Sequence, residues 1–491
     1  MANYPKTIRL IITAKKKVRK ARYVALSYCW GVVTQVETTR LNLERHQESI
    51  PCESLPKTIQ DAAWITRKLG LRFLWVDCLC IIQKDWHDFH AESRRMASVY
   101  ENAYLTIAAT AADASTRGIF RMLPEAEHVV LPSKNGDTDL GSLYLSQHKV
   151  PGTTVFDAPL NRRGWVLQEH LFARRTVHFA ADQIYWECDT SFVGEDGVRV
   201  TNEADKTFPN RSLLLHILNN YKDVCRDPTL RKHKDDEMCI ESDVFSIWAK
   251  LVSFYSTRSL TDERDKLPAV VSLMLEIEST ISISPWPIHF HQGCLFGVPY
   301  LELECLLWRA QSNQPLRQPK QFRAPTWSWA SIDGAIEFLD LFIKGRPSFT
   351  FVDIRTPQDA DLKIVSIGGY TPKGMCAREA LFLNGIALEC SAPASADTAT
   401  RVECVNTPDG DRFNVNLTFD FPSCRPTSFC LIPAFVRWAD EPSPYYLCLI
   451  VQSVEASTVQ SNSTVFKRVG AGYVFDVDRV SRHKRRFLVV I

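Results

Sequence analysis

Glu169 is the residue best placed for breaking a glycosidic bond. It shares one face of a predicted helix over residues 163–175 with Trp165, Gln168 and Phe172, at spacing i, i+3, i+4, i+7. Two of these are large and apolar, so the face is expected to be buried, and a buried carboxylate needs a partner or a function. Glycosidic cleavage passes through an oxocarbenium-like centre, which a carboxylate stabilises. The alternative is an ion pair with a neighbouring arginine, for which the candidates are Arg162, Arg163 and Arg174.

Four more side chains with binding chemistry follow two short apolar runs. Ser27 lies at the end of the first run, and Trp30 follows it. Asp77 lies at the end of the second run, and Gln83 follows it. Open parallel sheets bind ligands beyond the carboxyl ends of their strands. The hydroxyl, the carboxylate, the amide and the indole face together predict a nucleotide or nicotinamide pocket at this rim. The alternative is that Ser27 and Asp77 cap loops and helix starts while Trp30 fills the core.

Cys78 and Cys80, with His87 and His90 nearby, form the one segment that suggests a metal. In zinc sites two cysteines are usually separated by two to four residues, and a second pair of ligands follows. Here a single residue separates Cys78 from Cys80, and no matching second pair follows. We therefore predict no metal site and expect buried thiols, although a nucleophilic pair of Cys80 with a distant histidine stays open. The sequence has neither a Gly-x-x-x-x-Gly-Lys nor a Gly-x-Gly-x-x-Gly motif, so the usual ATPase and dehydrogenase signatures are absent.

The elements that position these residues alternate between strand and helix. Apolar runs predict strands at Val24–Ser27, Leu74–Asp77 and Leu105–Ala108, separated by helices at 56–69 and Asp88–Asn102. Such alternation predicts a parallel sheet with right-handed crossovers and helices on its faces.

Further elements are predicted beyond the third strand. Met122–Thr154 is expected to be a loop with one edge hairpin, and 176–179 with 183–186 a second hairpin. Helices are predicted at Ser212–Val224 and Val244–Tyr255. From about residue 322 the chain becomes rich in β-favouring residues. The predicted strands there are Phe349–Ile354, Val415–Phe419, Tyr445–Gln452 and Phe487–Ile491.

Composition excludes several classes of protein. The chain has 491 residues and a net charge of +2, so no global field favours nucleic acid. No apolar run approaches the roughly 20 residues that span a bilayer, and Met1–Leu10 has no secretory h-region. The 15 cysteines are odd in number and scattered, which is typical of a reducing compartment. We therefore expect a cytoplasmic protein.

Three blocks of the sequence resemble the fungal heterokaryon-incompatibility (HET) domain. They are Tyr23–Gly31; the stretch from Leu55–Ala62 through Leu74–Gln83 to Ala103; and Arg163–Glu169. Asp265–Val270 and Pro325–Gly334 look like segments that follow in full-length members. The chain departs from the family pattern at Val32 and Val33, where a small residue is common, and at Lys84, where an acid is common.

The resemblance implies a fold and a division of the chain. The expected fold is α/β, with a parallel-sheet, TIR- or flavodoxin-like HET domain at residues 20–190. A helical and irregular connecting region at 191–320 and a β-rich α+β accessory region at 321–491 would follow.

The resemblance also implies a role in fungal non-self recognition, leading to growth arrest or programmed cell death. The expected mechanism is assembly, with other incompatibility proteins or further copies of this chain as partners. The alternative is NAD cleavage, because the family looks distantly similar to TIR domains, some of which cleave NAD. In that case Glu169 and Asp77 are the expected catalytic residues, and Ser27, Trp30 and Gln83 the binding residues. NAD would be a substrate, and no resident cofactor is expected. Whether the chain is an enzyme is left open by the sequence.

Overall fold

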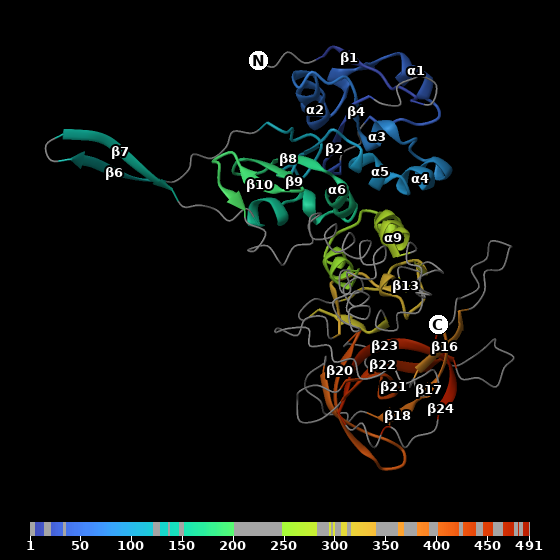
Figure 1. Ribbon diagram of the computed structural model, residues 1–491. Helices are drawn as coiled ribbons and strands as arrows, with labels where there is room; N and C mark the ends of the chain where they lie inside the picture. Colours follow the sequence, from blue (N-terminus) through green and yellow to red (C-terminus); the bar gives the residue numbers. More distant parts are fainter. Residues whose placement is uncertain are drawn as a thin grey trace, which may run out of the picture. The chain divides into compact units, whose positions relative to one another are not determined.

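The chain forms two compact units (Figure 1). Unit 1 comprises Met1–His216, Arg258–Thr261 and Pro268–Leu273, and unit 2 comprises Ile217–Thr257, Asp262–Leu267 and Met274–Ile491. The three-part division of the chain near residues 190 and 320 stays a prediction. The structure is a computed structural model that describes residues 5–13, 21–32, 36–120, 128–135, 138–146, 152–200, 248–281, 294–295, 298–299, 306–311, 316–339, 362–367, 381–391, 401–421, 426–437, 445–454, 465–475, 480 and 485–490.

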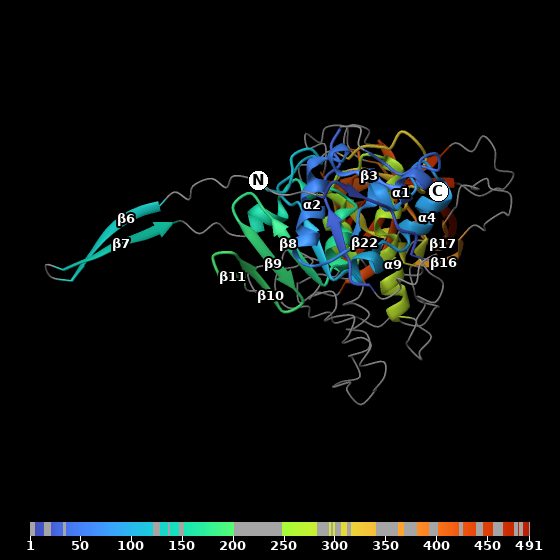
Figure 2. The same cartoon turned by 90° about the horizontal axis from the view of Figure 1, so that it is seen from above.

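Unit 1 is built on a seven-stranded sheet in the order β11-β10-β9-β8-β5-β2-β4. The strands are β2 (Val24–Ser27), β4 (Leu74–Trp75), β5 (Leu105–Ala108), β8 (Arg175–Phe179), β9 (Ile184–Cys188), β10 (Ser191–Gly194) and β11 (Arg199–Val200). The strands β4, β2, β5 and β8 are parallel, as predicted for the first three. From β8 to β11 each strand runs antiparallel to the next, and the four strands lie side by side in Figure 2. The pair of β8 and β9 confirms the predicted second hairpin.

The order of the parallel strands creates a switch point at β2. Numbered along the chain, β4-β2-β5-β8 reads 2-1-3-4, because the chain crosses from β2 to β4 on one side and then returns to β5 on the other. Flavodoxin-type sheets begin with the same order and bind their ligand at this point. Here antiparallel β9 stands where that type has a fifth parallel strand, so the TIR- or flavodoxin-like classification stays a prediction.

The helices of unit 1 differ in detail from those expected. Asp77 opens a short helix instead of ending a strand, and residues 88–102 form two helices instead of one. The break follows Ser93, where the N–H of Arg95 bonds to Glu92 O, one residue short of the helical partner. The predicted helix at 163–175 is also shorter. The helices are α1 (Leu43–Glu48), α2 (Lys57–Lys68), α3 (Asp77–Cys80), α4 (Trp86–Ser93), α5 (Met96–Glu101) and α6 (Val166–Phe172).

The two faces of the sheet bury different helices. Val24 and Leu26 of β2 belong to the same buried cluster as Ile59 of α2. Successive strand residues point to opposite faces, so Ser27 points away from α2. Ala108 of β5 pairs with Ser27 in register and packs on Val166 of α6. The end of β2 therefore presents Ser27 to α6, and α5 packs beside α6.

Smaller elements complete the described part of unit 1. The predicted hairpin at 122–154 exists as β6 and β7, but it forms its own two-stranded sheet and is not an edge of the larger one. A second small sheet joins β1 to β3. The bounds are β1 (Thr7–Ile8), β3 (Ile50–Pro51), β6 (His128–Asn135), β7 (Thr138–Ser146), the 3-10 helices η1 (Cys52–Ser54) and η3 (Leu160–Arg162), and the π-helix η2 (Gly152–Phe156).

Unit 2 is rich in strands, as predicted, and six of them form a closed antiparallel barrel, which was not predicted. The strands β23-β20-β19-β18-β21-β22 pair in this order and β22 pairs again with β23, so the ring closes. The strands β24, β17 and β16 continue the sheet from β23. The bounds are β16 (Leu362–Ile367), β17 (Leu381–Ile386), β18 (Leu388–Ser391), β19 (Arg401–Asn406), β20 (Arg412–Phe419), β21 (Ser428–Arg437), β22 (Tyr445–Val454), β23 (Val465–Val474) and β24 (Arg485–Val490).

The remaining described elements are short, except for one helix. They are a helix over 248–256, η5 (Glu263–Lys266), α9 (Pro268–Ile281), β12 (Cys294–Leu295), β13 (Val298–Pro299), β14 (Trp308–Ala310), η8 (Trp329–Ser331) and β15 (Ile336–Phe338). The predicted helix at Ser212–Val224 and the predicted strand at Phe349–Ile354 lie outside the described residues. Among the helices that are described, none combines the length and the apolar character that a membrane crossing requires.

Candidate active site

Six side chains gather at the switch point, and we call them the acid cluster: Ser27, Trp30, Asp77, Tyr100, Arg163 and Glu169. Ser27 is the last residue of β2, and Asp77 begins α3 two residues after β4. Tyr100 and Glu169 come from the packed helices α5 and α6. The cluster thus lies at the carboxyl end of the strand about which the sheet order reverses, where open α/β sheets bind ligands.

Glu169 is the deepest acid of the cluster. The residue is 5% exposed, and its Oε2 lies 3.0 Å from the hydroxyl of Tyr100. That hydroxyl also lies 3.2 Å from Leu26 O, and one phenolic proton cannot serve both acceptors. Tyr100 therefore donates to Glu169 Oε2 or to Leu26 O, but not fully to both at once.

Burial raises the pKa of Glu169, and the negative charge of Asp77 adds to the rise, while Arg163, Ser27 and Tyr100 oppose it. The Ser27 hydroxyl is buried beside Glu169 and lowers its pKa by donating to it, although the contact lacks the geometry of an ordinary hydrogen bond.

Asp77 is the outer acid and is half-buried. Its carboxylate accepts hydrogen bonds from Trp30 Nε1 at 2.7 Å and from the backbone N–H of Cys78 at 2.6 Å. Burial raises the pKa of Asp77 as well, against the lowering effect of Arg163, Trp30 and the Cys78 N–H. Two carboxyl groups at one site with raised pKa values are a common arrangement in acid–base catalysis.

Arg163 is the one cation of the acid cluster. Its guanidinium donates to Tyr28 O and lowers the pKa of both carboxyls through its charge. The expected alternative for Glu169, an ion pair with a nearby arginine, is not formed with the described residues. Arg174 pairs with Glu101, and Arg162 donates to Asp157 O.

Trp30 is held in place by the glycine that follows it. Gly31 has φ +77°, and a Cβ there would lie 2.6 Å from the Cβ of Ala114. The chain from Ser115 returns over this turn, since Ser115 Oγ donates to Trp30 O at 3.0 Å. The close approach fixes the half-buried indole above Asp77.

Gln83 is the predicted site residue that does not join the acid cluster through its side chain. Its amide donates to two backbone carbonyls, Asp77 O at 3.2 Å and Ile81 O at 3.1 Å. The amide therefore holds the loop after α3. Two members that were not predicted as site residues, Tyr100 and Arg163, had a signal in the sequence, because each is a polar group on an otherwise buried face.

The thiols near the acid cluster are free and protonated. Burial raises the pKa of Cys29 to about 11 and that of Cys80 to about 12, and it raises that of Cys78 well above its usual value. Cys78 is a buried thiol, as predicted, whereas Cys80 is only half-buried. The raised pKa of Cys80 disfavours a nucleophilic role, because the attacking species is the thiolate.

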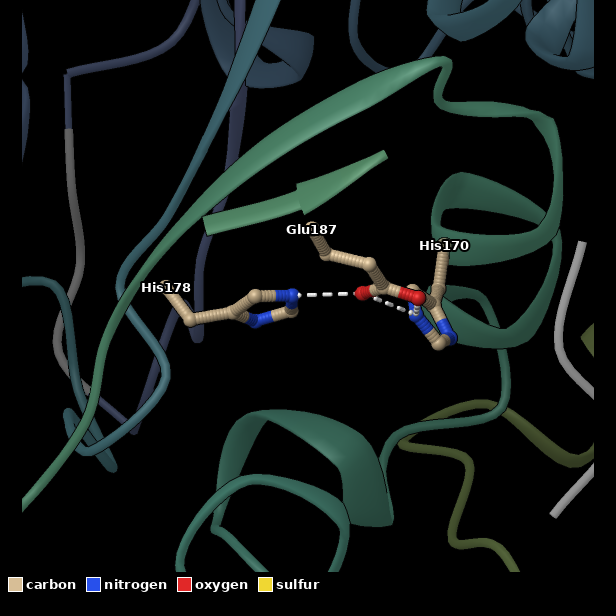
Figure 3. Close-up of side chains that lie close together, drawn as sticks. All are labelled: His170, His178 and Glu187. Carbon is tan, nitrogen blue, oxygen red and sulfur yellow. Dashed lines mark hydrogen bonds and ion pairs between the residues drawn. The ribbon is translucent and has the colours of Figure 1, made fainter. Parts of the chain in front are cut away.

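A second polar cluster lies on the other side of α6. We call it the histidine–glutamate cluster: His170, His178 and Glu187 (Figure 3). His170 Nε2 lies 3.0 and 2.8 Å from the two carboxylate oxygens of Glu187, and His178 Nε2 lies 2.8 Å from Oε2. This cluster was not predicted from the sequence. The available signal was His178 within one predicted strand and Glu187 directly after the next, which the structure extends to Cys188.

Residues 23–169 match the family model described as Heterokaryon incompatibility protein (HET). The match ends at Glu169 and so includes every member of the acid cluster, whereas His170, His178 and Glu187 lie beyond it. No curated protein and no protein of solved structure matches the chain.

Proposed function

We propose that this chain, which carries a heterokaryon-incompatibility domain at residues 23–169, is an effector of fungal heterokaryon incompatibility. It would respond to fusion with a genetically different strain by arresting growth or killing the fused cell. The support for this role is the family match together with the three sequence blocks that carry it.

The mechanism that the geometry favours is cleavage of the N-glycosidic bond of a dinucleotide such as NAD. The observation that carries it is the pair Asp77 and Glu169, two carboxyls with raised pKa values beside a half-buried indole. In this reaction the bond between the ribose C1′ and nicotinamide breaks, and its electron pair leaves with nicotinamide. A carboxylate stabilises the oxocarbenium-like centre and takes a proton from the attacking water. Asp77, the outer acid, is the group that reaches the ligand first.

Ser27 and Trp30 fit a binding role in this mechanism. The buried Ser27 hydroxyl faces Glu169 without a hydrogen bond of ordinary geometry, so a ribose hydroxyl could bond to both groups. The indole of Trp30 offers a stacking face, and its N–H already orients Asp77.

The competing mechanism is protein assembly, in which contacts with other incompatibility proteins or with further copies of the chain are the output. It needs no working acid cluster. The two mechanisms therefore differ in what Asp77→Asn and Glu169→Gln should do.

The test expresses the full chain in yeast and measures cellular NAD, growth and the melting temperature of the purified protein. Glu92→Gln is the matched control, because Glu92 is a half-buried acid of α4 with a pKa raised by burial, outside the acid cluster. NAD loss with the wild type and Glu92→Gln, but not with folded Asp77→Asn or Glu169→Gln, is the expected result. Growth arrest at constant NAD in all four proteins would overturn cleavage in favour of assembly.

A further inference from the structure

The histidine–glutamate cluster brings together three side chains from three separate elements. His170 lies on α6, His178 on β8 and Glu187 on β9. Glu187 pairs in register with Thr176, so His178 is its diagonal neighbour on the same face of the sheet. His170 and His178 are 7% and 3% exposed, and the Glu187 side chain is 15% exposed. The three are thus withdrawn from solvent and converge on one point.

The ligand atoms are spaced as a metal ion requires. One imidazole nitrogen of each histidine and one carboxylate oxygen of Glu187 all lie within 4.8 Å of one another. With metal–ligand bonds near 2.0–2.1 Å, ligand atoms of a tetrahedral site lie about 3.3 Å apart. The 2.8–3.0 Å contacts to Glu187 therefore need to open by only a few tenths of an ångström.

The surroundings of His178 fix which of its nitrogens faces the cluster. Its Nδ1 lies 3.2 Å from Thr110 Oγ1, which lies 3.3 Å from Ala108 O. When Nε2 binds a metal, Nδ1 carries the proton and donates to Thr110, and Thr110 donates onward to Ala108 O. Metal-bound histidines usually have such a partner on the second nitrogen.

Aromatic side chains surround the cluster in the part of unit 1 that the structure describes. Phe156 lies beside the imidazole of His170, and Phe192 lies beside that of His178.

We propose that His170, His178 and Glu187 bind one divalent transition-metal ion such as Zn²⁺, through the Nε2 atoms and a carboxylate oxygen. Two histidines and a glutamate are an established zinc donor set, and they leave a further coordination position to water or another ligand. The ion joins α6 to the β8–β9 hairpin. This inference does not depend on NAD cleavage and holds equally for an assembly mechanism.

The test strips the purified full chain with a chelator and titrates it with Zn²⁺ and, separately, with Co²⁺. The expected result is one tightly bound equivalent and a rise in melting temperature. Bound Co²⁺ should show visible d–d bands without a thiolate-to-metal charge-transfer band, which excludes the cysteines as ligands.

Four variants locate the site. His178→Gln and Glu187→Gln should abolish stoichiometric binding, and Thr110→Val, which removes the partner of His178 Nδ1, should weaken it about 10- to 100-fold. The double variant His87→Gln/His90→Gln, which removes two exposed imidazoles, should bind like the wild type.

Two outcomes overturn the proposal. One is a folded wild-type protein that binds no equivalent of either ion, in which case the three residues form a hydrogen-bonded triad only. The other is binding that persists in Glu187→Gln or carries a thiolate band. If the ligand variants do not fold, two measurements still test the proposal. They are the metal affinity of Thr110→Val and the cobalt spectrum of the wild type.

Discussion

Glu169 and His170 are consecutive residues of α6, and their buried side chains enter two different clusters. Glu169 meets the hydroxyl of Tyr100 at 3.0 Å, while His170 meets the carboxylate of Glu187 at 2.8 Å. Neighbouring residues of an α-helix point about 100° apart, so one short helix serves both clusters. All seven residues of α6 are buried, and this packing fixes the rotation of the helix relative to the two clusters.

The first prediction concerns the hydroxyl of Tyr100. Tyr100→Phe removes a buried group that lies between Glu169 and Leu26 O, and both lose a partner. We expect the free energy of unfolding to fall by about 1–3 kcal/mol, measured by urea denaturation. Tyr23→Phe is the control, because its hydroxyl bonds only the half-buried Val99 O. Equal losses in the two variants would contradict a special role for the Tyr100 hydroxyl.

The second prediction concerns the pH dependence of stability. The pKa of Glu169 is raised in the folded protein, so the folded state holds this proton more tightly than the unfolded chain. Its carboxyl therefore costs stability as pH rises above the unfolded pKa of about 4.3. Because glutamine has no proton to lose, Glu169→Gln should gain stability relative to the wild type between pH 4 and pH 8.

For Glu187→Gln we expect the opposite change of stability with pH in the same experiment. The pKa of Glu187 is lowered, so its carboxylate contributes stability that is present above the unfolded pKa and lost as pH falls through the folded pKa. Measured with chelator at pH 4, 6 and 8, this variant should lose stability relative to the wild type as pH rises from 4. Parallel trends for the two variants would show that local burial does not set these pKa values.

The third prediction separates two costs at Gly31. Gly31→Ala suffers both a positive φ of +77° and a Cβ 2.6 Å from that of Ala114. Gly70→Ala has nearly the same φ, +72°, but nothing within 4 Å of the new Cβ. Each should lose roughly 1–2 kcal/mol for the backbone, and Gly31→Ala about 1–3 kcal/mol more for the contact. Denaturation midpoints measure the difference, and its absence would mean that the turn after Trp30 relaxes freely.

The fourth prediction concerns thiol reactivity within unit 1. Burial raises the pKa of Cys188, but hydrogen bonds from Ser191 and Thr190 outweigh it and bring the value to about 7. The pKa values of the buried Cys29 and the half-buried Cys80 are raised to about 11 and about 12. Iodoacetamide at pH 7.5 should therefore alkylate Cys188 first among these three, as peptide mass mapping can show. Faster labelling of Cys80 would revive it as a nucleophile.

The parallel sheet could be predicted from the sequence because its strands are apolar on both faces. β2 and β5 have the predicted bounds, since every residue in them is buried and the pattern is unambiguous. At Asp77 the prediction was wrong because the carboxylate accepts the N–H of Cys78 and starts a helix. Local hydrogen bonding there decided between two structures that an apolar run alone does not distinguish.

That Asp77 and Glu169 lie at one site could be predicted from two features, the shared rim of a parallel sheet and the inward helix face of Glu169. The strand order itself was not predicted. The histidine–glutamate cluster could not be predicted in the same way. It depends on the register between β8 and β9, which places Glu187 opposite Thr176 and beside His178. A shift of one residue would send Glu187 to the other face, and nothing in the composition of the turn settles that register.

The barrel of unit 2 has one weak seam. Most neighbouring strands in its ring pair over several residues, but in the described residues β18 and β19 pair only at Ser391 and Asn406. In a closed ring no strand can fray at an outer edge, so amide protons exchange with solvent only when a ladder opens. Exchange should therefore begin at this seam and reach β20, β22 and β23 last, where the glycines of β23 lie against the backbone of β20. The seam gives the barrel a preferred place to open, and the rest of the ring would stay protected after that opening.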